Sequence, residues 1–424
     1  MERRRIGGAA GLIAAIALAA AIVIAPTAGT ASPDPNPWLQ KRFLVMAHQG
    51  GEDEAPSNTM FALKSAIQTR GADSLELDVN LSKDGQLMVI HDDTWTRIAC
   101  MDTLCPGPNS STEQHRPASE VNDLTLSELQ SLDGGYWFRP GTYSHNYALP
   151  GSNYPYRGIR TGDKPPPWGY TAEDFEIPTL RQVLNTFPNV PINIEIKMIK
   201  TTTGTAGGCV TDNAIQYCDD PESSMRVADK LVQLLNEAKY SSRDDIIVVS
   251  FSDELIDEFH RMAGPPFVAL APGVDDATAF ALAGTTPDPD VAAFQVPPDQ
   301  LGIQVPELLL ENRSAHCLGY AVHIWTNGDQ DETPAAYERF YNSGADGVMT
   351  SRPSQLRSWL DEHSITSPDG RDPLTWPKDC PVPPPTAPTQ TAPQPAPEAK
   401  KKCRKKSASA AKKKSKCKKG KKKK

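Results

Sequence analysis

The sequence has no Cys-x-x-Cys pair, in which two residues separate the cysteines, although structural zinc sites commonly use this spacing. We therefore expect disulfides rather than zinc, as in exported proteins. The eight cysteines fall as four pairs of sequence neighbours, which are Cys100 and Cys105, Cys209 and Cys218, Cys317 and Cys380, and Cys403 and Cys417. Sequence alone does not determine their connectivity, but each of the first two pairs would close a short loop.

The N-terminal apolar run is poor in leucine, which argues against a retained membrane anchor. Three arginines at positions 3–5 precede the Ala- and Gly-rich run Gly7–Ala25, and small residues follow as far as Ala31. This pattern predicts a cleaved signal peptide over residues 1–31. An anchor is the alternative, because the run approaches the roughly 20 residues that span a bilayer. The paired arginines leave twin-arginine export open. In each case we expect the body to be secreted or at the cell surface.

The last 25 residues contain no acid. Lys400–Lys424 holds 16 Lys or Arg, and eight of the seventeen residues from Pro381 to Pro397 are proline. We expect a stiff Pro-rich linker over residues 366–399 and a disordered polybasic tail over 400–424. Without the 16 basic residues of this tail, the chain has 28 basic and 52 acidic residues, so its body is acidic. The tail should bind an anionic cell-wall polymer or acidic lipid rather than a specific nucleic acid, although a merely solubilising tail is the alternative.

Between these segments, short apolar runs alternate with amphipathic stretches, which is typical of a parallel sheet. Eight or nine candidate strands over about 310 residues suit a closed α/β barrel over residues 42–365 better than an open sheet. The strands are predicted at Phe43–Ala47, Ser74–Leu81, Leu87–His91, Ile192–Lys197, Ile246–Phe251, Phe267–Ala271, Ala292–Val296, His323–Thr326 and Gly347–Thr350. The helices include Asn58–Arg70, Thr179–Phe187, Met225–Ala238, Glu254–Met262, Glu307–His316 and Ala335–Ser343. No internal repeat is found beyond this alternation.

Polar residues gather where these strands end, which is where barrel enzymes place catalytic groups. They are His48, Glu76, Asp78, His91, Glu195 and Lys197. Glu76 and Asp78 lie two apart, so their side chains share one face of a strand. Three carboxylates in a buried setting favour a hard divalent cation such as Ca²⁺ or Mg²⁺. A structural ion cluster with Lys197 and a nearby arginine is the alternative from the residues alone.

An ordered series of motifs runs through the chain. The motifs are Met46–Gly50, Pro56–Thr59, Gly71–Asp73, Leu75–Val79, Lys83–Gly85, Val89–Asp92, Ile194–Lys197, Ser250–Phe251, Trp325–Asn327 and Gly344–Thr350. With this series the chain resembles glycerophosphodiester phosphodiesterases from about Leu44 to Leu360. Each motif is weakly specific by itself, but ten in the same order are strongly so.

The resemblance implies a TIM (β/α)₈ barrel and hydrolysis of glycerophosphodiesters to glycerol phosphate and an alcohol, through a cyclic phosphate. It implies one divalent cation, Ca²⁺ or Mg²⁺, held by Glu76, Asp78 and Glu195. His48 and His91 would be the general acid and base, which suits the ordinary pKa of histidine, about 6.5. Lys197 would hold a non-bridging phosphate oxygen.

The chain departs from the family pattern at two positions. Gln49 stands where the family usually has an arginine on the phosphate, so a hydrogen bond could remain but the charge is lost. Ser57 replaces a glutamate, and the nearby acids at positions 52–54 are candidates to replace it. Trp325 is expected near the site, either packing the barrel wall or contacting substrate.

Two insertions should lie on the catalytic face because each follows the end of a predicted strand. One includes Arg139–Glu176, and the other is Thr201–Glu222. The first holds several aromatic residues that could stack on ligands or on one another, namely Tyr143, Tyr147, Tyr154, Tyr156, Trp168 and Tyr170.

Two other functions stay open at this point. One is a phospholipase of the phosphatidylinositol-specific C or sphingomyelinase D type, which shares the barrel logic. The other is a catalytically dead barrel that binds anionic surfaces.

Overall fold

The computed structural model describes residues 36–39, 41–94, 120–141, 153–212, 215–265, 268–288 and 290–368. The chain divides into two compact units, Met1–Pro381 and Val382–Lys424, and every described residue belongs to the first. The predicted signal peptide, the tail and nearly all of the linker lie outside the described residues. Among the residues that are described, none of the helices is both long and apolar enough to cross a membrane.

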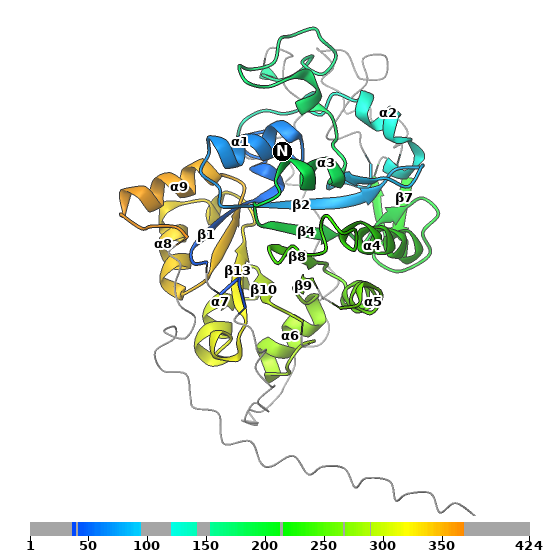
Figure 1. Cartoon of the computed structure of the whole chain (residues 1–424). Coiled ribbons are helices and arrows are strands. Elements are labelled where there is room, and N and C mark those ends of the chain that lie inside the picture. Colours follow the sequence, from blue (N-terminus) through cyan, green and yellow to red (C-terminus); the bar gives the residue numbers. More distant parts are fainter. Residues whose placement is uncertain are drawn as a thin grey trace, which may run out of the picture. The chain divides into compact units, whose positions relative to one another are not determined.

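Eight parallel strands of the described residues form a nearly closed barrel (Figure 1). Neighbouring strands follow the order β10-β13-β14-β1-β2-β4-β8-β9, and a parallel bridge from Leu270 to Val291 brings β9 close to β10. The strands are β1 Leu44–Ala47, β2 Ser74–Leu81, β4 Ile192–Ile196, β8 Ile246–Val249, β9 Ala269–Leu270, β10 Ala293–Val296, β13 Ala321–Trp325 and β14 Gly347–Thr350. The predicted TIM-barrel fold is confirmed.

Helices lie around the barrel (Figure 1), and most begin with a side chain that caps the first turn. Thr59, for example, accepts a hydrogen bond from the backbone of Ala62 at the start of α1. The helices are α1 Met60–Gln68, α3 Leu180–Thr186, α4 Pro221–Leu235, α5 Asp253–Ala263, α6 Val274–Ala283, α8 Pro334–Ser343 and α9 Pro353–Glu362. After β10 comes α7 Val305–Glu307, which continues as a π-helical turn over Leu308–Asn312, so the regular helix predicted for Glu307–His316 is irregular.

The prediction that Leu87–His91 is a barrel strand was wrong. The strand β3 covers Leu87–Val89 and runs antiparallel to β2, with Leu87 opposite Leu81 and Val89 opposite Val79. The reason is the connection, since parallel neighbours need a crossover of a dozen or more residues and Lys83–Gly85 is a tight turn. The hairpin carries the chain back along β2, so Ile90 donates to the carbonyl of Asp78 at 3.1 Å. His91 therefore reaches the level of Asp78 by a different route.

The strands read as apolar runs because both of their faces are buried. Residues such as Val45, Leu77 and Val248 point outward and pack against the helices. Met46 and Ile247 belong to a second cluster inside the barrel, together with Trp38.

The N-terminal segment closes the end of the barrel where the strands begin. Asn36 donates to the carbonyl oxygens of Ala292 and Gly319 at 2.6 and 2.8 Å, just before β10 and β13. Trp38 packs edge-on against His323, with 5.7 Å between ring centroids. Both ring nitrogens of His323 are buried and have no hydrogen-bond partner among the described residues.

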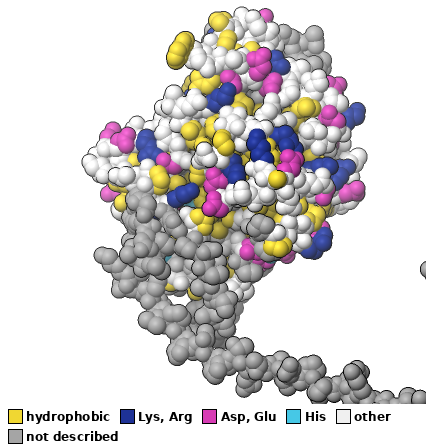
Figure 2. Space-filling model, viewed as in Figure 1, with side chains coloured by type: hydrophobic (Ala, Val, Ile, Leu, Met, Phe, Trp, Pro, Cys, Tyr) yellow, Lys and Arg dark blue, Asp and Glu magenta, His cyan; other side chains and the backbone are white. Residues whose placement is uncertain are grey.

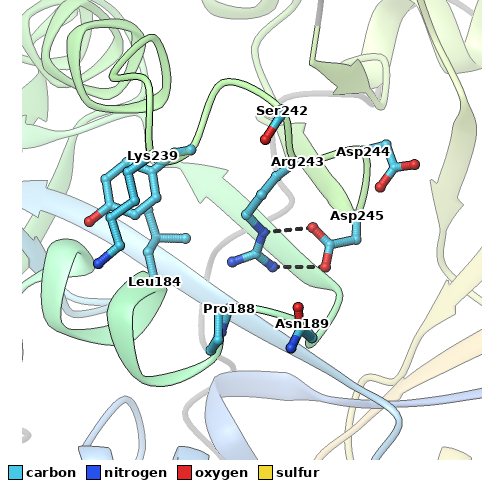
Figure 3. Close-up of a pocket in the computed structure, with 9 residues that line it drawn as sticks. Leu184, Pro188, Asn189, Lys239, Ser242, Arg243, Asp244 and Asp245 are labelled. Carbon is cyan, nitrogen blue, oxygen red and sulfur yellow. Dashed lines mark hydrogen bonds and ion pairs between the residues drawn. The ribbon is translucent and has the colours of Figure 1, made fainter.

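A surface pocket of about 280 Å³ lies at the same end, beside the loops that lead into β4 and β8 (Figure 3). Arg243 bonds Asp245 through two nitrogens, at 2.6 and 3.0 Å, and donates to the carbonyls of Phe187 and Val190. These bonds tie the two loops together, so we assign the pocket a structural role.

The described parts of both insertions lie at the opposite end, where the strands finish, as predicted. Gly141 donates to the carbonyl of Asp53 at 2.7 Å, and Asp174 pairs with Lys64 on the first turns of α1 at 2.6 Å. The second insertion holds a disulfide between Cys209 and Cys218, one of the two short loops that the sequence leaves open. Cys317 is also disulfide-bonded. The other five cysteines lie outside the described residues.

The aromatic residues of the first insertion mostly pack on one another and on α1. The ring centroids of Tyr156 and Tyr170 lie 4.8 and 4.7 Å from that of Phe61, and Tyr154 is buried. Trp168 is the exception, with a side chain that is 99% exposed. Tyr143 and Tyr147 lie outside the described residues.

The buried His323 makes stability depend on pH. Burial lowers the pKa of His323 to about 4, whereas the unfolded chain has an ordinary value near 6.5. The unfolded state therefore takes up the proton first, and stability falls as pH drops from about 6.5 towards 4. Between pH 7 and pH 4.5 the free energy of unfolding should fall in both proteins. We expect the fall to be about 2 to 3 kcal/mol smaller in His323→Leu than in the wild type. Urea unfolding at both pH values measures this difference, and equal losses would contradict it.

Candidate active site

Three carboxylates converge inside the barrel near the ends of two adjacent strands. Glu76 and Asp78 come from β2 and Glu195 from β4, where Asp78 and Glu195 are opposite each other in the ladder. One oxygen from each side chain lies within 4.8 Å of the other two. The three residues are 2%, 0% and 9% exposed, so water screens their repulsion poorly.

Lys197 lies two residues beyond Glu195, on the same side of the extended chain, and its positive charge offsets part of the negative charge of the carboxylates. Its Nζ lies 2.9 Å from Glu195 Oε1 and 3.5 Å from Asp78 Oδ1. Burial and the neighbouring Asp78 raise the pKa of Glu76. Burial also disfavours the charged form of Asp78, but His91, Lys197 and His48 outweigh it and lower the pKa of Asp78. One ammonium group thus faces three carboxylates.

The donor set fits a hard divalent cation. All the potential ligands are carboxylate oxygens, as Ca²⁺ and Mg²⁺ prefer. Asp78 Oδ1 is buried and has no hydrogen-bond partner among the described residues, whereas Asn58 donates to Asp78 Oδ2 at 3.1 Å. A buried carboxylate oxygen whose nearest cation is the Lys197 ammonium at 3.5 Å, with no hydrogen bond, has room for a metal ion as a further partner.

His48 follows β1 directly and lies in the short 3₁₀ turn His48–Gly50. Its Nδ1 is 2.6 Å from Glu52 Oε1, and its Nε2 is 3.8 Å from Glu76 Oε2. Burial opposes protonation, but the carboxylates of Glu52 and Glu76 outweigh it and raise the pKa of His48 to about 10. The side chain remains 28% exposed, so a ligand can reach it.

His91 has a matching arrangement on the other side of Lys197. Its Nδ1 is 2.7 Å from Asp92 Oδ1, and its Nε2 is 3.2 Å from Lys197 Nζ. Both histidines therefore have Nδ1 anchored on a carboxylate and Nε2 turned towards the charged cluster. An anchored Nδ1 is how enzymes set the tautomer of an acid–base histidine.

The two anchoring carboxylates were not among the predicted site residues. Glu52 had been considered only as a replacement for the glutamate that Ser57 lacks, and Asp92 only as part of a motif. The signal in the sequence for such an anchor is an acid shortly after a strand-end histidine. Glu52 follows His48 by four residues, and Asp92 follows His91 by one. Asn58, which holds Asp78, was likewise not predicted for the site.

Gln49 is buried beside the carboxylate cluster, and Trp325 borders the cluster through Phe251. Gln49 has a left-handed backbone, with φ of 50°, and its N–H donates to Glu76 Oε2 at 2.9 Å. Trp325 ends β13 and packs edge-on against Phe251, with 6.0 Å between centroids. Phe251 is 53% exposed and its ring lies 5.9 Å from Lys197 Nζ. An aromatic wall thus stands beside the charged cluster.

Known proteins share this architecture. The model of the glycerophosphoryl diester phosphodiesterase family matches residues 48–355. A glycerophosphodiester phosphodiesterase of Caldanaerobacter subterraneus is 27% identical over 319 residues, covering 74% of this chain and 96% of that protein. The human lysophospholipase D GDPD1 is 26% identical over 338 residues, covering 77% and 89%.

Solved structures show the same fold. A putative glycerophosphoryl diester phosphodiesterase of Silicibacter pomeroyi has a TM-score of 0.53 at 18% identity, covering 78% of this chain and 98% of that one. A phosphodiesterase domain from Mycobacterium tuberculosis has a TM-score of 0.50 at 18% identity, covering 75% and 99%. Because the family model spans most of the chain, including every strand of the barrel after β1, this protein belongs to the glycerophosphoryl diester phosphodiesterase family.

Proposed function

We propose that the chain is an exported, metal-dependent enzyme that hydrolyses glycerophosphodiesters to glycerol phosphate and an alcohol, with His48 and His91 as general acid and base. The observation that carries this proposal is the convergence of three buried carboxylates, a lysine and two anchored histidines at one end of the barrel.

Glu76, Asp78 and Glu195 would hold the divalent cation, Ca²⁺ or Mg²⁺. When bound, such a cation neutralises phosphate charge and favours ionisation of a coordinated hydroxyl. It would also relieve the mutual repulsion of the three carboxylates, which Lys197 only partly offsets.

The chain's own residues account for the proton transfers. One histidine takes the proton of the glycerol 2-hydroxyl as its oxygen attacks phosphorus, and the other protonates the oxygen of the leaving alcohol. Water then opens the resulting cyclic phosphate, with the two histidines exchanging roles. The Lys197 ammonium would stabilise the charge on a non-bridging oxygen. Gln49, whose backbone N–H contacts Glu76, could donate a side-chain hydrogen bond to the phosphate but supplies no charge.

This chemistry restricts the substrate to diesters with a free hydroxyl next to the phosphate. The aromatic wall of Phe251 and Trp325 lies where an apolar part of a substrate could rest. The intact carboxylate set and both histidines argue against a dead barrel. None of these contacts favours a phospholipase of the phosphatidylinositol-specific C or sphingomyelinase D type.

Export and surface binding complete the proposal. Residues 1–31 would direct export, and the tail Lys400–Lys424 would hold the enzyme on an anionic cell-wall polymer or acidic lipid. On the face of the described residues that Figure 2 shows, basic and acidic side chains are interspersed, whereas the tail carries 16 basic residues and no acid. The tail is therefore the segment suited to an anionic surface.

Removing any one of the three carboxylates should abolish activity and weaken metal binding. Loss of an outer partner of a metal ligand typically costs about 10–100-fold in affinity. We therefore expect Glu76→Gln, Asp78→Asn and Glu195→Gln to weaken Ca²⁺ or Mg²⁺ binding by about 100-fold or more. Calorimetric titration measures this, with the exposed Glu173→Gln as a matched control. Unchanged affinity in all three variants would refute the metal site.

The two histidines should matter for turnover and not for metal binding. We expect His48→Ala and His91→Ala each to lower kcat by about 10²–10⁴-fold, the usual contribution of a general acid or base. Steady-state kinetics on glycerophosphocholine measures kcat, and calorimetry checks that the cation still binds. His363, which stacks on Trp359 in the last helix, provides the control His363→Ala. Near-normal kcat in either active-site variant would exclude the two-histidine mechanism.

Truncation after Cys380 should separate surface binding from catalysis. Turnover of a small soluble diester should not change, because all the proposed site residues lie between His48 and Trp325. Co-sedimentation with cell-wall preparations should be lost, and in the full chain it should weaken steeply with added salt. If both proteins are retained equally, the tail is not the tether.

A further inference from the structure

A buried carboxylate outside the predicted site ties together the ends of two barrel strands. Glu332 precedes α8, is 2% exposed and has four neutral donors. Its Oε1 accepts from Thr326 Oγ1 at 2.6 Å and from the Ser351 N–H at 2.8 Å, and its Oε2 accepts from the hydroxyls of Tyr337 and Thr350, both at 2.6 Å.

These donors come from three different elements. Thr326 follows β13, Thr350 ends β14 and Ser351 follows it, and Tyr337 lies on α8. Tyr337 and Thr350 are fully buried and Thr326 and Ser351 are half-buried, and together the four donors satisfy the carboxylate without a cation. Glu332 thereby determines the backbone position of Ser351 at the catalytic end of the barrel.

Ser351 passes this position on to the active site. Its Oγ donates to Glu52 Oε1 at 2.8 Å, and the same oxygen is 2.6 Å from His48 Nδ1. Its carbonyl accepts from the Asp53 N–H at 3.2 Å. The other oxygen of the same carboxylate, Glu52 Oε2, is buried with no hydrogen-bond partner among the described residues. The orientation of Glu52 therefore rests on its contacts with Ser351 and His48.

We propose that Glu332 is a positioning residue for catalysis, which acts on His48 through Ser351 and Glu52. This inference rests on the proposed role of His48. Glu332 holds the Ser351 backbone, the Ser351 hydroxyl holds the Glu52 carboxylate, and Glu52 holds the Nδ1 proton, so that Nε2 faces the reacting groups. Losing the first contact loosens the last, although Glu332 touches neither substrate nor cation.

A double-mutant cycle tests the chain of contacts. Glu332→Gln places an amide among groups that all donate, and Ser351→Ala removes only the link to Glu52. We expect each to lower kcat about tenfold while KM stays within about twofold. In a Glu52→Gln background, which already lacks the carboxylate, neither substitution should lower kcat further. Glu332→Asp, which keeps the charge, should recover part of the loss.

Asp346 provides the control for a purely structural role. It is also a buried carboxylate, and it accepts from His316 Nε2 at 2.7 Å and from the Val322 N–H at 2.8 Å at the opposite end of β14. We expect Asp346→Asn to lower the melting temperature while kcat stays unchanged. A similar loss of kcat in Asp346→Asn and Glu332→Gln would attribute the loss to stability and overturn the proposal.

The outcomes separate this inference from the proposed function. Suppose that His48→Ala is inactive, and that Ser351→Ala and Glu332→Gln each lower kcat by the same factor in the wild-type and Glu52→Gln backgrounds. The positioning role of Glu332 is then wrong, whereas the proposed mechanism stands. Unchanged kcat in Ser351→Ala would also overturn the positioning role, since that variant keeps the Glu332 network. If His48→Ala retains its kcat, the proposed mechanism itself fails.

Discussion

The repulsion among Glu76, Asp78 and Glu195 is the constraint around which the catalytic end of this protein is built. Three carboxylates that are almost fully buried, with oxygens within 4.8 Å of one another, cannot all remain charged unless positive charge lies beside them. Lys197 supplies one such charge directly. Burial and the adjacent carboxylate raise the pKa of Glu76, so without a further cation the cluster favours holding a proton. A site under this tension is suited to bind a divalent ion.

The barrel supplies the rigidity that such a cluster needs. β2 and β4 are neighbours in a parallel ladder with Asp78 opposite Glu195, so the carboxylates cannot separate without breaking the sheet. The histidines, in contrast, come from a short turn after β1 and from the end of a hairpin, and neither segment is part of the barrel wall. Each therefore depends on a carboxylate for its orientation, Glu52 for His48 and Asp92 for His91. Rigid strands thus hold the three carboxylates, whereas hydrogen bonds hold the two histidines.

The chain departs from the family pattern at Ser57 and Gln49, and the two departures differ in what surrounds them. Ser57 lacks the family's carboxylate, but the Glu52 carboxylate contacts Nδ1 of His48. Ser351, after β14, donates to Glu52, and Glu332, before α8, accepts from the Ser351 backbone. The arginine replaced by Gln49 has no such substitute among the contacts of the described site residues. The positive charge nearest the carboxylates is that of Lys197. Without the arginine, a bound phosphate would depend more on this ammonium group for charge stabilisation.

The sequence by itself determined the class of fold and the residues that converge in the candidate site. Alternating apolar runs and amphipathic stretches specify strands and helices locally, and polar residues at strand ends stand out because a doubly buried strand tolerates them poorly. It did not determine how Leu87–His91 pairs, since an apolar run has the same pattern in either direction and only the short turn excludes a crossover. Nor did it assign Glu52, Asp92 and Glu332, because isolated acids near loops are mostly solvated. Their roles arise from contacts between segments as distant as Glu52 and Ser351, which only the closed barrel brings together.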